Sequence, residues 1–264
     1  MRSLKSGFIN STTFLAALFL ALFYSFDAAA QSDTGAYQKV TYYQVGKDNL
    51  DQFLDDASAW KDQHRGAIQR TDRIAWRLYR VIMSSSAGAW YNFVTVEQAR
   101  NLNTLQERSR SSAESLKGDR DKRNKLSFAV HSEIWFTEAE ISGNGSAPSR
   151  YLNANFMYAV PHALADYLDL EIDIAAPLHQ HQADNNRMDG WNFNRLVFPT
   201  GTTVAYNFVT TDFYSSLEQI EMGITREVIM DVHPDMDVDE FEDFADSIRE
   251  RVWSDLWELV EFVD

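Results

Sequence analysis

The alternation of apolar and polar positions along the chain predicts an α+β fold. Residues 48–68 carry Leu50, Phe53, Ala57 and Trp60 at helical spacing. The stretches around this helix alternate between two faces or are rich in β-branched and aromatic residues, as strands are. The expected strands of the first half are residues 37–45, 74–83, 89–96 and 130–138, with a polar helix before the last of them. This order is β-α-β-β-α-β, the ferredoxin-like unit.

The second half of the chain repeats the first. Sliding the sequence against itself by 115 residues superimposes Tyr91–Thr95 on Tyr206–Thr210, and 11 identities fall within 53 positions. The other identical pairs are Tyr43/Tyr158, Val45/Val160, Asp51/Asp166, His64/His179, Trp76/Trp191 and Arg80/Arg195. A shift of seven more residues matches Val130–Trp135 with Val252–Trp257. These matches indicate a duplicated unit.

The second copy is expected to contain the same elements in the same order. They are strands at residues 153–160 and 255–263, a helix ending near His181, a hairpin around Pro199–Gly201 and a helix from Asp239. A stretch rich in Gly, Ser and Pro at residues 141–150 predicts a flexible linker between the copies. The expected organisation is therefore repeat 1 at residues 31–140 and repeat 2 at residues 151–264.

Two such units in one chain resemble the dimeric α/β-barrel superfamily, which includes antibiotic-biosynthesis-type monooxygenases, NIPSNAP-like proteins and haem-dependent relatives. The pattern H-x(11)-W-x(3)-R followed by Y-N-F-V-T also resembles secreted bacterial proteins of unassigned activity. The resemblance implies two tandem ferredoxin-like units packed as an intramolecular dimeric α/β barrel, in which two four-stranded sheets face each other. A monomer is expected, because the pseudo-dimer lies within one chain. The resemblance brings no catalytic motif, and no haem ligand of the relatives maps onto this sequence.

The first 30 residues have the pattern of a bacterial signal peptide. Arg2 and Lys5 precede ten uninterrupted apolar residues at 14–23, and Ala28–Ala30 supplies a cleavage pattern. Ten helical residues span roughly 15 Å, about half of a bilayer core, so no stable membrane anchor is expected after cleavage near Ala30. The expected location is secreted or periplasmic.

Charge and cysteine content exclude several function classes. Lys and Arg number 24 against 39 Asp and Glu, a net charge of -15, and a phosphate backbone repels such a surface. No nucleic-acid partner is therefore expected. The chain contains no cysteine, which excludes disulfides, thiolate metal sites and cysteine nucleophiles.

No metal site and no cofactor are predicted, although haem stays open as an alternative through the resemblance. His179 and His181 are expected on a helix end, where residues two apart diverge by about 200°. Asp235, Asp237 and Asp239 resemble the start of a calcium loop, but Glu240 stands at the sixth position, where the loop requires Gly. An N-cap at Asp239, with Glu242 as its partner, is the simpler interpretation.

Polar residues that recur on apolar faces are the candidate site. The candidate ligand-binding residues are His64, Trp76, Arg80 and Tyr91 in the first half and His179, Trp191, Arg195 and Tyr206 in the second. In one interpretation, each half holds a pocket between its first helix and its sheet, where the arginine binds a carboxylate and the histidine donates a hydrogen bond. In the other, Arg80 pairs with Glu133 and Arg195 with Asp255, and the aromatic residues belong to the core.

Three classes of function remain open on the sequence. The first is a secreted or periplasmic protein that binds a small organic molecule in the barrel, an anion being one candidate ligand. The second is an enzyme of the cofactor-free or haem-using oxygenase type known in the resembled superfamily. The third is a structural module that presents surfaces to a partner. Fold alone does not decide among them.

Overall fold

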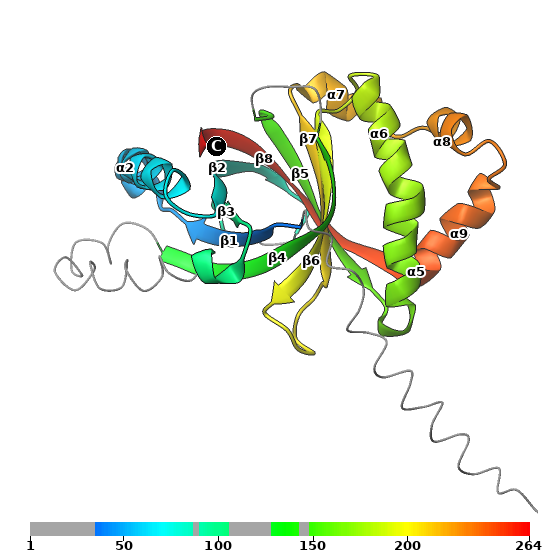
Figure 1. Cartoon of the computed structure of the whole chain (residues 1–264), viewed down its shortest axis with the longest axis horizontal. Coiled ribbons are helices and arrows are strands. Elements are labelled where there is room, and N and C mark those ends of the chain that lie inside the picture. Colours follow the sequence, from blue (N-terminus) through cyan, green and yellow to red (C-terminus); the bar gives the residue numbers. More distant parts are fainter. Residues whose placement is uncertain (1–34, 87–89, 106–127, 143–147) are drawn as a thin grey trace, which may run out of the picture. The chain divides into compact units, whose positions relative to one another are not determined.

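Each half of the chain supplies four strands, and the eight strands close into one antiparallel barrel (Figure 1). The structure is a computed structural model that describes residues 35–86, 90–105, 128–142 and 148–264. The strands of the first half are β1 (Tyr37–Gln44), β2 (Arg73–Ser84), β3 (Phe93–Ala99) and β4 (Phe128–Ser142). Those of the second half are β5 (Tyr151–Ala159), β6 (Gly190–Phe198), β7 (Phe208–Tyr214) and β8 (Arg249–Val263). The predicted signal peptide lies outside the described residues.

The strand order confirms the duplicated unit and the dimeric α/β-barrel fold. The order is β4-β1-β3-β2 in the first half and β8-β5-β7-β6 in the second, which is the same order twice. Two long strands join the halves, because β4 pairs with both β1 and β6, and β8 pairs with both β5 and β2. The two sheets therefore meet along their edges as well as facing each other. β4 also continues to Ser142, two residues into the stretch expected as a linker.

Helices cover the outer face of the barrel. In the first half, a 3-10 turn (Lys47–Asn49) leads into α2 (Leu50–Ile68), which packs on β2 and β8. In the second half, the helical segments are a 3-10 turn (Pro161–Ala163), α5 (Leu164–Asp169), a π-helical turn (Leu170–Ala175) and α6 (Ala176–Asp184). The polar helix expected before β4 falls largely at residues 106–127, outside the described residues. Among the described helices, none is long and apolar enough to cross a membrane.

The segment between β7 and β8 contains three helices, two of which the sequence patterns did not predict. They are α7 (Leu217–Met222), α8 (Arg226–Val232) and α9 (Val238–Ile248). A capping box formed by Ser216 and Gln219 starts α7. The cap of α9 was expected at Asp239 but is Asp237, whose carboxylate accepts from the backbone N–H groups of Asp239 and Glu240. Asp239 instead pairs with Arg226.

A π-helical turn explains why one offset does not align the whole repeat. The Asn92 side chain accepts a hydrogen bond from the Val45 N–H at 2.8 Å, and the Asn207 side chain does the same for Ala159 at 2.8 Å. Val45 and Ala159 are therefore equivalent, an offset of 114 (159 minus 45). The π-helical turn at 170–175 adds one residue, after which the offset of 115 holds. The sequence pairs Tyr43/Tyr158, Val45/Val160 and Asp51/Asp166 are thus not structural equivalents.

Aromatic side chains fill the barrel interior around two buried carboxylates. Glu133 on β4 accepts hydrogen bonds from the Tyr42 hydroxyl and the Trp135 indole, each at 2.9 Å, and from the Tyr206 hydroxyl. The apolar side chains of this interior come from both halves and include Val40, Tyr79, Val94, Leu152, Phe156, Val209 and Trp257. Most of the interior is thus a packed core, although a cavity of about 140 Å³ is lined by Tyr79 of this cluster and by Phe213, which packs against it.

Each repeat gives a tyrosine to the carboxylate of the other repeat. Tyr206 of the second half donates to Glu133 of the first, and Tyr91 of the first half donates to Asp255 of the second. Burial and the adjacent carboxylate raise the pKa of Tyr91 and of Tyr206 well above their usual value, so both hydroxyls stay protonated donors. The two repeats are therefore bonded reciprocally across the barrel.

Removing either cross-repeat hydroxyl should destabilise the whole barrel. Tyr206→Phe and Tyr91→Phe each take a donor from a buried carboxylate, which costs about 1–3 kcal/mol of unfolding free energy. Urea denaturation measures this loss. The control is Tyr79→Phe, because Tyr79 is buried in the same interior but donates to no carboxylate among the described residues. Equal stability of all three variants would contradict the importance of the cross-repeat bonds.

Candidate functional site

The two candidate arginines lie on the outer surface of the barrel, away from the candidate histidines. The Arg80 side chain is 56% exposed and pairs with Glu258, and the Arg195 side chain is 47% exposed and pairs with Glu138. The predicted pairs of Arg80 with Glu133 and of Arg195 with Asp255 are wrong. Side chains alternate along a strand, so both carboxylates point into the barrel while both arginines point outward.

The two candidate histidines are stacked on the two candidate tryptophans. His64 lies on Trp76 with ring centroids 4.9 Å apart and 16° between the planes, and His179 lies on Trp191 at 4.8 Å and 14°. Both stacks sit between the helices and the outer face of the sheet. Tyr91 and Tyr206 point into the barrel instead. The eight candidates therefore divide among the interior, the helix-covered face and the open surface.

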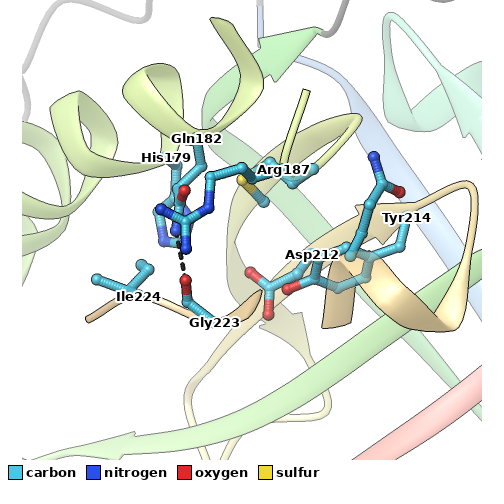
Figure 2. A pocket seen from close by; sticks show the side chains of 9 residues that line it. His179, Gln182, Arg187, Asp212, Tyr214, Gly223 and Ile224 are labelled. Atoms are coloured by element: carbon cyan, nitrogen blue, oxygen red, sulfur yellow. Dashed lines mark hydrogen bonds between the residues drawn. The ribbon is translucent and has the colours of Figure 1, made fainter. Parts of the chain in front are cut away.

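Repeat 2 has cavities beside its histidine. Two adjoining cavities, of about 210 and 260 Å³, share His179, Asp212 and Ile224 as lining residues. Figure 2 shows the smaller one, with His179, Gln182 and Arg187 on the helix side and Asp212 on the strand side. We call this smaller cavity the α6 cavity.

Asp212 is the acidic residue on the strand side of the α6 cavity, and its counterpart in repeat 1 is Glu97. Trp76 pairs with Glu97 across β2 and β3, as Trp191 pairs with Asp212 across β6 and β7. Glu97 is neutralised by Arg73, at 2.5 Å, whose side chain is only 4% exposed. Arg73 also donates to the Thr104 carbonyl at 3.0 Å. A buried arginine thus closes this position in repeat 1.

In repeat 2, no arginine stands at the position that corresponds to Arg73, and the Asp212 carboxylate is held by side-chain amides instead. Met188 stands 115 residues after Arg73 and lines the α6 cavity. The Oδ2 atom of Asp212 accepts hydrogen bonds from the side-chain amides of Asn153 and Asn155, at 3.2 and 3.0 Å. No ion pair neutralises Asp212 among the described residues, so its charge is available to the cavity.

Two further polar groups of the α6 cavity lack partners among the described residues. The Gln182 amide donates to the Gly223 carbonyl at 2.6 Å, which fixes its orientation and leaves its Oε1 buried and unbonded. Gly223 has a φ of 56°, in the left-handed region that favours glycine. The Nδ1 atom of His179 is also buried without a partner. Burial lowers the pKa of His179, against the opposing effect of Asp212, so the ring is neutral near pH 7.

The larger cavity contains a carboxyl group that titrates near neutrality. Burial raises the pKa of Glu171 to about 7, and the Tyr167 hydroxyl and the Arg249 guanidinium partly oppose this rise. Groups with a pKa near the working pH are suited to general acid–base chemistry. Sequence patterns did not reveal Glu171, Gln182, Arg187 or Asp212, because none of them recurs as an identity in the other repeat.

The described part of the chain offers no obvious metal site. It contains no group of three or more His, Asp or Glu side chains in a metal-binding arrangement. What repeat 2 does offer is a small cavity with an anionic wall, a neutral imidazole and a guanidinium. Such a site can bind a polar organic molecule by charge and hydrogen bonds.

Comparisons with known proteins find relatives in structure but not in sequence. No family model matches the chain, and no curated protein matches it. A protein described as a provisional monooxygenase from Fusobacterium nucleatum subsp. nucleatum matches with a TM-score of 0.59 and 6% identity, over 87% of this chain and 94% of that one. A provisional chlorite dismutase, TA0507, matches with a TM-score of 0.53 and 13% identity, over 86% and 96%.

A chlorite dismutase variant from Candidatus Nitrospira defluvii has the same fold, with a TM-score of 0.51 and 8% identity, over 86% of this chain and 91% of that one. At such identities the likeness shows the fold alone. Together with the closed eight-stranded barrel, it shows that the chain folds as a dimeric α/β barrel in which one chain supplies both halves.

Proposed function

We propose that the protein binds a small organic molecule and that its site is the α6 cavity. The observation that carries this proposal is the difference between the repeats. Where repeat 1 buries an Arg73–Glu97 ion pair, repeat 2 has a cavity lined by Asp212, His179 and Gln182. Buried polar atoms without partners are costly, and a bound molecule that satisfies them offsets this cost.

The proposed site lies outside the barrel, between the helix and the sheet of repeat 2, which is one of the two locations that the sequence suggested; the other was the barrel interior. The interior is filled by aromatic and aliphatic side chains from both repeats. Glu133, one of its two buried carboxylates, already accepts from Tyr42, Trp135 and Tyr206. An anionic ligand was expected on the basis of Arg80 and Arg195, but both are paired on the surface, away from the cavity.

The resemblance to haem-dependent relatives left haem open as a cofactor. The residues around His179 do not fit one. The two adjoining cavities hold about 210 and 260 Å³, so even together they lie at the lower end of the roughly 300–1,000 Å³ range of pockets for drug-sized molecules. A porphyrin is larger than such molecules. The His179 ring also lies flat on Trp191. The proposed ligand is therefore smaller than a haem.

An acid–base enzyme is the second candidate function. Glu171, with a pKa of about 7, and the neutral His179 both line the larger cavity. Such a pair can exchange protons with a bound molecule near neutral pH. The monooxygenase named among the structural neighbours shares the fold, and it supports an enzyme only by analogy.

The chain is also proposed to be an exported monomer. The support is the leader pattern at residues 1–30 and the closure of the barrel within one chain. We expect the mature chain to begin near Gln31, and mass spectrometry of the exported protein measures its first residue. A mature chain that retains Met1 would contradict export by cleavage.

Replacing His179 should abolish ligand binding, whereas replacing His64 should not. A thermal-shift screen of a library of small organic molecules should yield compounds that raise the melting temperature of the wild type, because binding stabilises the native state. His179→Phe keeps the stack on Trp191 but removes the cavity nitrogen, so these compounds should no longer act on it. His64→Phe makes the same change on Trp76 in repeat 1 and serves as the control. A screen without compounds, or one whose compounds act equally on both variants, would refute the proposed site.

Replacing Glu171 should change how stability depends on pH. Folded Glu171 keeps its proton up to about pH 7, whereas an unfolded glutamate releases it near pH 4.5. The folded state therefore binds more protons between these values, and the wild type loses stability as the pH rises through this window. Glu171→Gln lacks this loss, so its unfolding free energy relative to the wild type should increase by about 3 kcal/mol between pH 4.5 and pH 8. Urea titrations at both pH values measure the increase, and a constant difference would disprove the assigned titration.

A further inference from the structure

The walls of the α6 cavity carry opposite charges that do not meet. Asp212 lies at the strand side on β7, and Arg187 lies at the helix side, just after α6 (Figure 2). They form no ion pair within the described part of the chain. The equivalent acid in repeat 1 does form one, with Arg73. Repeat 2 therefore holds a separated pair of charges with a cavity of about 210 Å³ between them.

The α6 cavity is lined by three hydrogen-bond acceptors. They are the Asp212 carboxylate, the unbonded Oε1 of the buried Gln182 and a nitrogen of the neutral His179. A neutral imidazole has one acceptor nitrogen, and an ammonium group has three N–H donors and no acceptor. The Asp212 carboxylate is the negatively charged one of these acceptors, so its charge matches an ammonium group in sign.

On the helix side, the Arg187 guanidinium is the charged donor. One N–H of the Arg187 guanidinium reaches the Met222 carbonyl at 3.3 Å. Its other N–H groups remain for a ligand, and a guanidinium fork matches a carboxylate in geometry. Met188 and Ile224 complete the lining with apolar surface, which suits a short aliphatic group. Glu171, Arg249 and Arg251 line the adjoining cavity and not this one.

We propose that the ligand of the α6 cavity is a small aliphatic zwitterion, an α-amino acid, whose ammonium group binds at Asp212 and whose carboxylate binds at Arg187. This inference rests on the proposed function, because it names the ligand class of the same site. In this proposal, the ammonium and carboxylate groups of the ligand pair with Asp212 and Arg187, which form no ion pair with other described residues. An uncharged ligand would leave the buried Asp212 charge without an ion-pair partner, at a cost that ion pairing to a zwitterion offsets.

Three probes with the same isobutyl group test how much each charge of the ligand contributes to binding. They are L-leucine, which is a zwitterion, isoamylamine, which carries only the ammonium group, and isocaproate, which carries only the carboxylate. Isothermal titration calorimetry on the mature protein should show that leucine binds about 10-fold or more tightly than either of the others. Each charged hydrogen bond contributes about 1.5–3 kcal/mol, which corresponds to roughly 10- to 100-fold in affinity.

Two variants and a control assign each end of the ligand. Asp212→Asn keeps an oxygen that can accept from Asn153 and Asn155 but removes the charge, so leucine and isoamylamine should both bind about 10- to 100-fold more weakly. Arg187→Met should weaken leucine and isocaproate and leave isoamylamine unchanged. Arg195→Met removes an arginine of the same repeat whose surface pair with Glu138 lies outside the cavity, and it should leave all three probes unaffected.

Other outcomes would overturn the zwitterion. Leucine that binds no better than isoamylamine would mean a cation site, and leucine that binds no better than isocaproate would mean an anion site. If no probe binds while library compounds still depend on His179, the zwitterion is wrong and the proposed function stands. If no library compound depends on His179, the proposed function itself fails.

Discussion

The barrel depends on its two longest strands, because each of them pairs with strands of both repeats. β4 lies between β1 and β6, and β8 lies between β5 and β2. The buried carboxylates Glu133 and Asp255 stand on these strands and each receives a tyrosine from the other repeat. Backbone pairing and side-chain hydrogen bonds therefore join the repeats at the same places. Neither repeat can complete its own polar interior without the other, which explains why the two fold as one unit.

The two carboxylates have diverged in how fully they are satisfied. Glu133 accepts from Tyr42, Trp135 and Tyr206 and also lies 3.1 Å from His131. Asp255 is one methylene shorter, and its Oδ1 has no partner among the described residues. The indole nitrogens of Trp253 and Trp257 are likewise buried and unbonded. The same interior thus carries one complete and one incomplete hydrogen-bond network, as expected when duplicated copies drift apart under a shared fold.

The outer faces of the two repeats have also diverged, and this is where the candidate site lies. Both repeats keep a histidine stacked on a tryptophan under a helix. Repeat 1 places Arg73 against Glu97, whereas repeat 2 replaces that arginine with Met188 and opens a cavity beside Asp212. Because the barrel already holds the chain together, one repeat can lose a buried ion pair and gain a cavity. The cost of an unpaired carboxylate is offset in part by the amides of Asn153 and Asn155.

Periodicity and self-similarity in the sequence determined the duplication, the α+β class and the order of the elements along the chain, because side-chain alternation and repeated identities are local features. The closed barrel was expected only from the resemblance to a known superfamily. Periodicity and self-similarity also grouped His64 with Trp76 and His179 with Trp191 in one candidate site of each half, since each pair recurs at one offset, and the structure stacks the two rings in both halves. The partners of Arg80 and Arg195 were decided only by the tertiary structure, because they lie on strands that become neighbours when the barrel closes. The cavity was decided there too: Asp212, Gln182 and Arg187 come from different elements and share no repeat identity, so only packing places their charges around one space.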